Sequence, residues 1–194
     1  AAFSRAVWRI GLLMTHGMRR ENTPGESPLA GRSTTTGLTP SHPPRTGRPN
    51  VDPKGHPPAF VDTSFVVRYL TGDTEAMSQA AAEIIDSEAA LVLTLLVLVE
   101  TCYVLESVYR APRDAAVDAV VGLVQRRNVV VLGLPKPAVL TALTLCQGSG
   151  RVSYVDAVTW AQAVHVGATH VYTFDRRFPA QGLTAGPGPG RPTP

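Results

Sequence analysis

The sequence has few cysteines and no long hydrophobic run, and each shortage excludes a class of protein. Its 194 residues include two cysteines, Cys102 and Cys146, both in apolar segments of helical character. Such a pair does not form the disulfide framework of a small secreted domain and is typical of buried thiols in a reducing compartment. The longest apolar run, residues 89–99, is far shorter than the roughly 20 residues that span a bilayer. We therefore expect a cytoplasmic protein without a membrane-spanning segment.

Proline and charge are distributed unevenly, and the distribution predicts the domain boundaries. Nine of the 17 prolines lie in residues 1–58 and four in the last nine residues, 186–194. Residues 1–58 also carry eight basic and three acidic side chains, whereas residues 59–185 carry nine and twelve. We expect a disordered N-terminal extension over 1–58, one folded domain over 59–185 and a flexible tail over 186–194. The net charge of +3 arises outside the folded part, so it does not indicate nucleic-acid binding.

Within residues 59–185, short apolar runs alternate with longer segments of helical period. This alternation is typical of an α/β domain with a mainly parallel sheet, here of four or five strands. The individual strands are predicted at residues 59–62, 90–94, 128–134 and 170–173. Helices are predicted at residues 63–70, 75–87, 95–109, 113–127, 138–146 and 154–166.

Two acidic residues stand at the carboxyl ends of predicted strands. Asp62 and Asp175 each follow an apolar run, and open parallel sheets bind ligands in the crevice beyond the carboxyl ends of their strands. The two acids can therefore meet in one crevice. Asp62 suits equally well the N-cap of the helix that starts at residue 63, because Asp is a preferred capping residue.

Two further acids lie on predicted helices. At 100° per residue, the helical neighbours of Glu100 include Leu96, Val97, Tyr103 and Val104, which places a carboxylate on an almost wholly apolar face. We therefore expect Glu100 to be buried, where its charge needs a cation or a distant partner because burial of an unpaired carboxylate is costly. A lone protonated Glu in the core is the alternative. Asp156 follows Ser153 at the spacing of a capping box, and an acid in this first turn also suits a metal ligand.

The segments around these acids resemble a known family. VDTSFVVRYL (61–70), LVETCYVL (98–105), YVDA (154–157) and VYTFDRRF (171–178) are similar to the ordered motifs of PIN-domain ribonucleases, especially the VapC-type toxins of type II toxin-antitoxin pairs. The resemblance implies a three-layer α/β/α sandwich, a Mg²⁺ or Mn²⁺ site, and cleavage of RNA. Its acidic site would consist of Asp62, Glu100, Asp156 and Asp175, with Ser64 nearby. Arg177 stands where family members often carry a further acid.

Four oxygen ligands without His or Cys suit a hard cation such as Mg²⁺ or Mn²⁺, and a cation-bound water is easier to deprotonate for attack on a phosphodiester. We expect Asp62 and Asp156 to hold the metal, Asp175 to complete the shell, and Glu100 to act through water. Arg176 and Arg177 follow the last acid and are either phosphate contacts or solvated surface arginines.

Two alternatives stay open. A haloacid-dehalogenase-type phosphatase also uses a strand-end Asp, but it needs Asp-x-Asp, and Ser64 stands at the second position. A PIN-like domain that binds a partner without catalysis would be the non-enzymatic case. The resemblance also implies a cognate antitoxin and a homodimer. Residues 76–85 and 95–108 are apolar enough to bury one face in the core and still expose some apolar surface to such a partner.

Overall fold

A computed structural model describes residues 57–148 and 150–188 of the chain. The described part contains β1 (Ala59–Phe60), α2 (Thr63–Thr71), α3 (Glu75–Ile85), β2 (Leu91–Thr94), α4 (Leu95–Ser107), α5 (Arg113–Gln125), β3 (Val129–Leu132), α6 (Lys136–Leu145), α7 (Tyr154–His165), β4 (His170–Tyr172) and β5 (Thr184–Gly186). The predicted α/β class and all six predicted helices are confirmed. The predicted extension lies, apart from residues 57 and 58, outside the described residues, as does most of the predicted C-terminal tail.

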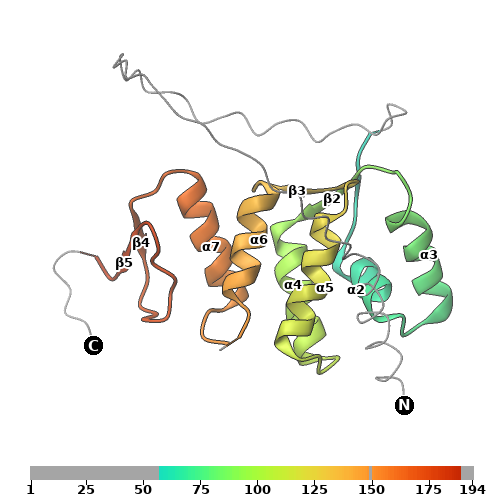
Figure 1. The fold of residues 1–194 in the computed structure, drawn as a ribbon, viewed down its shortest axis with the longest axis horizontal. Helices are drawn as coiled ribbons and strands as arrows, with labels where there is room; N and C mark the ends of the chain where they lie inside the picture. Colours follow the sequence, from blue (N-terminus) through green and yellow to red (C-terminus); the bar gives the residue numbers. More distant parts are fainter. Residues whose placement is uncertain (1–56, 149, 189–194) are drawn as a thin grey trace, which may run out of the picture.

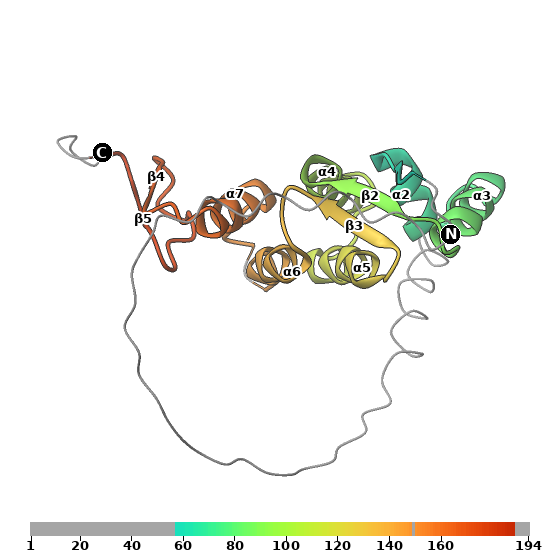
Figure 2. The ribbon, with the colours of Figure 1, turned by 90° about the horizontal axis from the view of Figure 1, so that it is seen from above.

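Three of the strands form one parallel sheet in the order β1-β2-β3. Helices α2 and α4 lie on one face of this sheet, and α5 and α6 lie on the other (Figures 1 and 2). The central strand β2 is buried at Leu91, Val92 and Leu93, as expected for a parallel strand covered on both faces. Each fully buried aliphatic side chain of this kind contributes about 1.5–3 kcal/mol. The layers therefore match the α/β/α arrangement that the sequence predicts.

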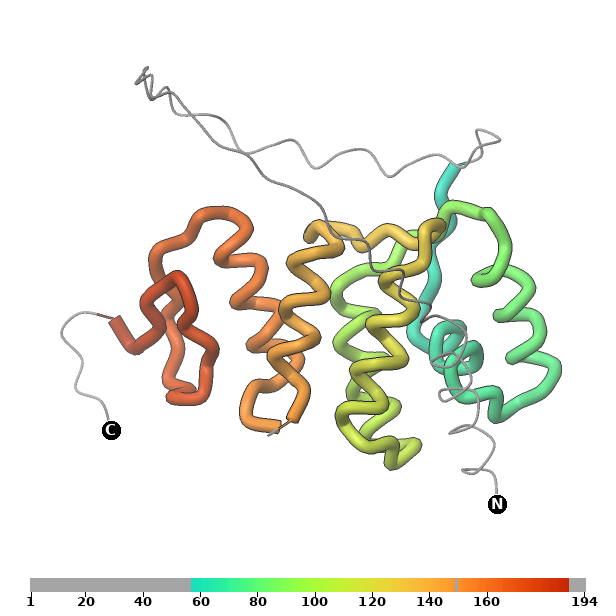
Figure 3. Tube along the Cα trace, in the orientation of Figure 1, coloured from blue at the N-terminus to red at the C-terminus, as the bar shows by residue number. Residues whose placement is uncertain are grey.

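Strands β4 and β5 form a separate parallel sheet of two strands. The sequence predicts one sheet of four or five strands; the described residues place five strands in two sheets. The reason lies in α7, which packs against α6 and α4 through buried side chains that include Ala157 and Trp160. Only residues 166–169 separate α7 from β4, so β4 stays at the end of α7 (Figure 3).

The helices are short. Among residues 57–148 and 150–188, none is long and apolar enough to cross a membrane. The longest, α4 and α5, have 13 residues each. Both cysteines are free and buried, as the sequence predicts.

Candidate carboxylate site

Asp62 links β1 to α2 and caps the helix. Its backbone is extended, and its Oδ1 accepts a hydrogen bond from the Phe65 N–H at 2.9 Å. The Ser64 hydroxyl donates to the same carboxylate at 3.1 Å. The predicted N-cap is thus confirmed. The side chain is also exposed to solvent, so the cap leaves the carboxylate open to a ligand.

Glu100 lies near Asp62 along the surface, because the residue after Asp62 binds it. The Thr63 hydroxyl donates a hydrogen bond of 2.6 Å to Glu100 Oε2, which joins the start of α2 to α4 across 37 positions of sequence. Thr63 was not a candidate residue, since a threonine in the first turn of a helix gives no signal of a long-range partner. Thr63 therefore links Glu100 on α4 to the start of α2, the helix that Asp62 caps.

The expectation that Glu100 lies on a buried apolar face is wrong. Glu100 is exposed, and its neighbours Leu96 and Tyr103 are 76% and 64% exposed. The helix buries a different face, formed by Leu98, Thr101, Cys102 and Leu105. Periodicity identifies which residues share a face, but the packing of other elements decides which face is covered. The cost of a buried charge therefore does not apply at Glu100.

Ser153 is the N-cap of α7, and Asp156 lies in the first turn, where its carboxylate accepts from the Ser153 hydroxyl and not from the Ser153 backbone N–H that a capping box uses. Ser153 Oγ accepts from the Asp156 N–H at 3.0 Å and donates to Asp156 Oδ2 at 2.6 Å. The carboxylate is half-buried. The spacing thus correctly predicts Ser153 as the helix cap, while the Asp156 carboxylate binds the capping hydroxyl.

The segment that leads into α7 is held by Arg113, a residue that the motifs did not single out. Its guanidinium donates to Cys146 O and Val152 O, each at 2.7 Å, and lies 4.2 Å from the centre of the Tyr154 ring. Glu106 accepts from the Tyr154 hydroxyl at 2.8 Å and pairs with Arg113 at 3.2 Å. This cluster fixes the first residue of α7 and hence the position of Asp156.

Asp175 follows β4 and is bound by its own loop. The Arg177 N–H donates to Asp175 Oδ1 at 2.8 Å, and Arg177 Nε approaches the same oxygen at 3.4 Å. The backbone N–H lowers the pKa of Asp175, and the charge of Arg177 acts in the same direction. Arg177 thus forms an ion pair with Asp175, while Arg176 is exposed.

These four acids are not gathered into one cluster. Within the part of the chain that the structure describes, no group of three or more His, Cys, Asp or Glu side chains is placed to hold a metal ion. Asp62 and Glu100 lie beside β1 and α4, whereas Asp175 lies with β4 and β5 at the end of the molecule (Figure 2). Oxygen donors suit a hard cation, but their arrangement within one chain does not fit a metal centre.

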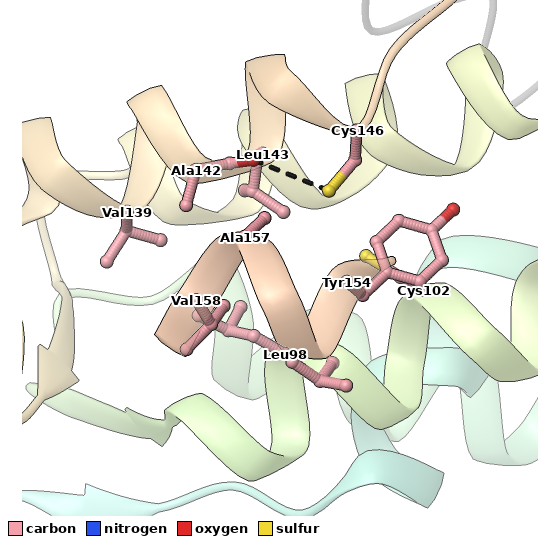
Figure 4. A pocket seen from close by; sticks show the side chains of 10 residues that line it. Leu98, Cys102, Val139, Ala142, Leu143, Cys146, Tyr154, Ala157 and Val158 are labelled. Atoms are coloured by element: carbon pink, nitrogen blue, oxygen red, sulfur yellow. Dashed lines mark hydrogen bonds between the residues drawn. The ribbon is translucent and has the colours of Figure 1, made fainter. Parts of the chain in front are cut away.

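A small apolar pocket lies between α4, α6 and α7. Leu98, Cys102, Cys146, Tyr154 and Ala157 are among its lining residues (Figure 4). The free space is about 10 Å³, which holds at most one water molecule. This pocket reflects packing between helices and does not form a ligand site.

Comparisons with known proteins give one match. The family model described as PIN domain matches residues 59–182, which contain all four acids. A search of curated proteins and a search of solved structures each found no match. PIN domains are generally nucleases that use divalent metal ions. The match covers more than half of the chain and agrees with the observed α/β fold, so the protein belongs to the PIN domain family.

Proposed function

We propose that this protein is a divalent-metal-dependent ribonuclease, the toxin of a type II toxin-antitoxin pair. The observation that carries the proposal is a pair of exposed carboxylates at the start of α2, where Asp62 caps the helix and the next residue, Thr63, binds Glu100. This pair lies where β1 ends, within a domain whose family is that of nucleases. Exposed carboxylates beside a strand end suit a hard cation, which would in turn bind the phosphodiester of RNA.

The side chains around this pair have distinct roles in the proposal. Thr63 orients Glu100 through its hydroxyl, and Ser64 donates to Asp62. Each contact fixes the direction of a carboxylate through a neutral hydroxyl donor and leaves further acceptor positions on its oxygens for a ligand. Asp156 and Asp175 are the remaining members of the proposed acidic set, and Arg176 is a proposed phosphate contact.

The first test is cleavage of a mixed pool of tRNA and rRNA by the full chain. We expect products with Mg²⁺ or Mn²⁺, loss of cleavage in EDTA, and recovery when the metal is restored. Asp62→Asn should abolish cleavage with little change in stability, because Asn caps helices about as well as Asp. Glu83→Gln is the matched control, since Glu83 is an exposed acid on α3. Full activity after thorough chelation would contradict the proposal.

The toxin role has its own test. Induced expression of the chain should arrest the growth of a bacterial host, and the Asp62→Asn variant should not. The cognate antitoxin is expected to relieve the arrest by direct binding. Growth arrest that persists in Asp62→Asn would show that the effect does not depend on RNA cleavage.

One observation favours a second candidate, a PIN-like module that binds a partner without catalysis. The four acids are not clustered in the described residues, and α4 exposes Leu96 and Tyr103. If no metal supports cleavage while Leu96→Ser or Tyr103→Ser abolishes growth arrest, the interaction module would be the better interpretation. If Asp62→Asn alone abolishes arrest, the nuclease would be.

A further inference from the structure

Within the described residues each sheet has two open edges, formed by β1 and β3 in one sheet and by β4 and β5 in the other. Strand β1 pairs only with β2, and strand β4 pairs only with β5. An exposed strand edge presents unpaired N–H and C=O groups and is a template for pairing with another chain. An isolated two-stranded sheet is also marginally stable by itself. The outer edges of β1 and β4 are therefore each open to a further strand.

The backbone hydrogen bonds show which residues point to these edges. Ala59 and Val61 donate to Ala90 O and Val92 O of the β2 side. Because bonding alternates along a parallel strand, the N–H and C=O of Phe60 point to the opposite edge. Phe60 is 63% exposed. The outer edge of β1 thus combines available backbone groups with an exposed aromatic ring.

Strand β4 also has backbone groups and aromatic side chains at its outer edge. Thr169 O and Thr173 N bond with β5, so the backbone groups of His170 and Tyr172 point away from β5. The His170 and Tyr172 rings lie 5.5 Å apart, and Tyr172 is 73% exposed. Both open edges belong to parallel strands and both carry exposed aromatic residues.

The chain holds its own β4 away from its own β1. In both Figure 1 and Figure 2, α6 and α7 lie between the two sheets. Helix α7 is packed on α6 and α4, and the Trp160 indole N–H donates to Gln181 O at 2.9 Å. This bond ties the segment before β5 to α7. Moving β4 to β1 within one chain would require α7 to leave its buried position.

We propose that a second copy of this chain supplies the missing strand, so that β4 of each copy pairs in parallel with β1 of the other. The combined sheet then has the order β3-β2-β1-β4-β5, which is the doubly wound order with its ligand crevice between β1 and β4. Exchange of identical elements between copies is a low-cost route to a dimer. Opposite charges also lie at the two strand ends: Asp62 and Glu100 lie near the end of β1, and Arg176 and Arg177 follow β4, where Arg177 is paired with Asp175.

This pairing accounts for the incomplete acidic site. Adjacent strands lie roughly 4.8 Å apart, and the carboxyl ends of parallel strands share one sheet edge. Asp62 of one copy and Asp175 of the second copy would therefore meet at that edge. The catalytic consequence rests on the proposed nuclease function, whereas the strand pairing does not.

The pairing is tested directly by disulfide trapping in the full chain. Phe60→Cys is combined in one chain with His170→Cys, Val171→Cys or Tyr172→Cys, so that every register that pairs residue 60 with β4 is covered. The native thiols do not interfere, because Cys102 and Cys146 are buried. Mild oxidation should give covalent dimers for at least one combination. Leu132→Cys with the same three partners is the control, since Leu132 is exposed on β3.

Each result decides the question. A covalent dimer specific to Phe60→Cys supports the proposal, whereas an intrachain disulfide in a monomer would show closure within one chain and overturn it. The absence of any bond would overturn it too. The unmodified chain provides an independent measurement: sedimentation should show a dimer at micromolar concentration, and a monomer at all concentrations contradicts the exchange.

Mixing inactive variants tests the composite site. Asp62→Asn and Asp175→Asn are each expected to be inactive, but a dimer of one copy of each contains one intact site. After joint refolding, about one quarter of wild-type cleavage should return, because half of random pairs are mixed and each has one of two sites. No recovery would show that both acids act from the same chain. If the unsubstituted protein cleaves no RNA while the disulfide dimers form, the proposed function fails and the pairing stands.

Discussion

Replacing Arg113 with methionine should lower the melting temperature by about 10 °C, as follows from the contacts of its guanidinium. Arg113 is the first residue of α5, where a positive charge is unfavourable because the amino end of a helix is itself positive. If Arg113 made no other contacts, its removal would stabilise the helix by about 0.3–1 kcal/mol, because an unfavourable charge would be lost. A solvated surface Arg113 and a hydrogen-bonded structural Arg113 therefore predict changes in melting temperature of opposite sign.

The magnitude comes from the bonds that Arg113 makes. It donates to two backbone carbonyls at 2.7 Å, pairs with Glu106, and has a side chain only 19% exposed. Hydrogen bonds to charged groups contribute about 1.5–3 kcal/mol each. Methionine keeps most of the apolar stem, so we expect a loss of about 3 kcal/mol, after partial replacement of the bonds by water. In a domain of this size, each kcal/mol shifts the melting temperature by about 3–4 °C.

Thermal unfolding followed by circular dichroism, with urea unfolding for the free energy, measures this loss. Arg113→Lys keeps the charge but cannot donate to both carbonyls in the planar geometry of a guanidinium, so it should retain less than half of the stabilisation. Arg127→Met is the matched control, because Arg127 is an exposed arginine just beyond α5. An unchanged or raised melting temperature in Arg113→Met would refute the reasoning.

Three further predictions concern individual ionisable groups. Asp175 should titrate below its ordinary value of 3.8 by NMR, and Arg177→Ala should raise that pKa only slightly, because the backbone N–H of residue 177 remains. Burial raises the pKa of Cys102 to about 12 and that of Cys146 to about 11, so both thiols should resist a thiol reagent at pH 8. Because the folded pKa lies above the ordinary value of 9.0, the stability that the two neutral thiols contribute should be complete below pH 9.0 and decrease at higher pH. Glu100→Gln should change the free energy of unfolding by less than about 0.5 kcal/mol, because Gln can still accept the hydrogen bond from the Thr63 hydroxyl and the site is exposed. Its rate of RNA cleavage should fall by orders of magnitude. Normal cleavage would remove Glu100 from the site.

The sequence predicts the helices well because their start signals are local. Asp62, Thr94 and Ser153 each accept a hydrogen bond from a backbone N–H three residues later. These residues are preferred N-caps, and a capping interaction involves only the first turn. The positions of the four acids relative to strands and helices could therefore be predicted without any knowledge of the packing.

The neighbours of each acid could not be predicted in the same way. The Thr63–Glu100 bond and the Arg113 contacts join residues more than 30 positions apart, and no local pattern contains them. The pairing of β4 with β5 has the same character, because strand order depends on where α7 packs. The sequence thus identifies the acids of the proposed site, whereas their distances depend on contacts between distant segments.

The two roles of Asp62 show why a structural interpretation does not exclude a functional one. A carboxylate has about four acceptor positions, and the Phe65 N–H and the Ser64 hydroxyl occupy part of them. The bonds that cap α2 also fix the direction of the carboxylate at the end of β1. A capping carboxylate whose charge is exposed is therefore already oriented to bind a metal ion. Asp62→Asn separates the roles, since it preserves the cap and removes only the charge.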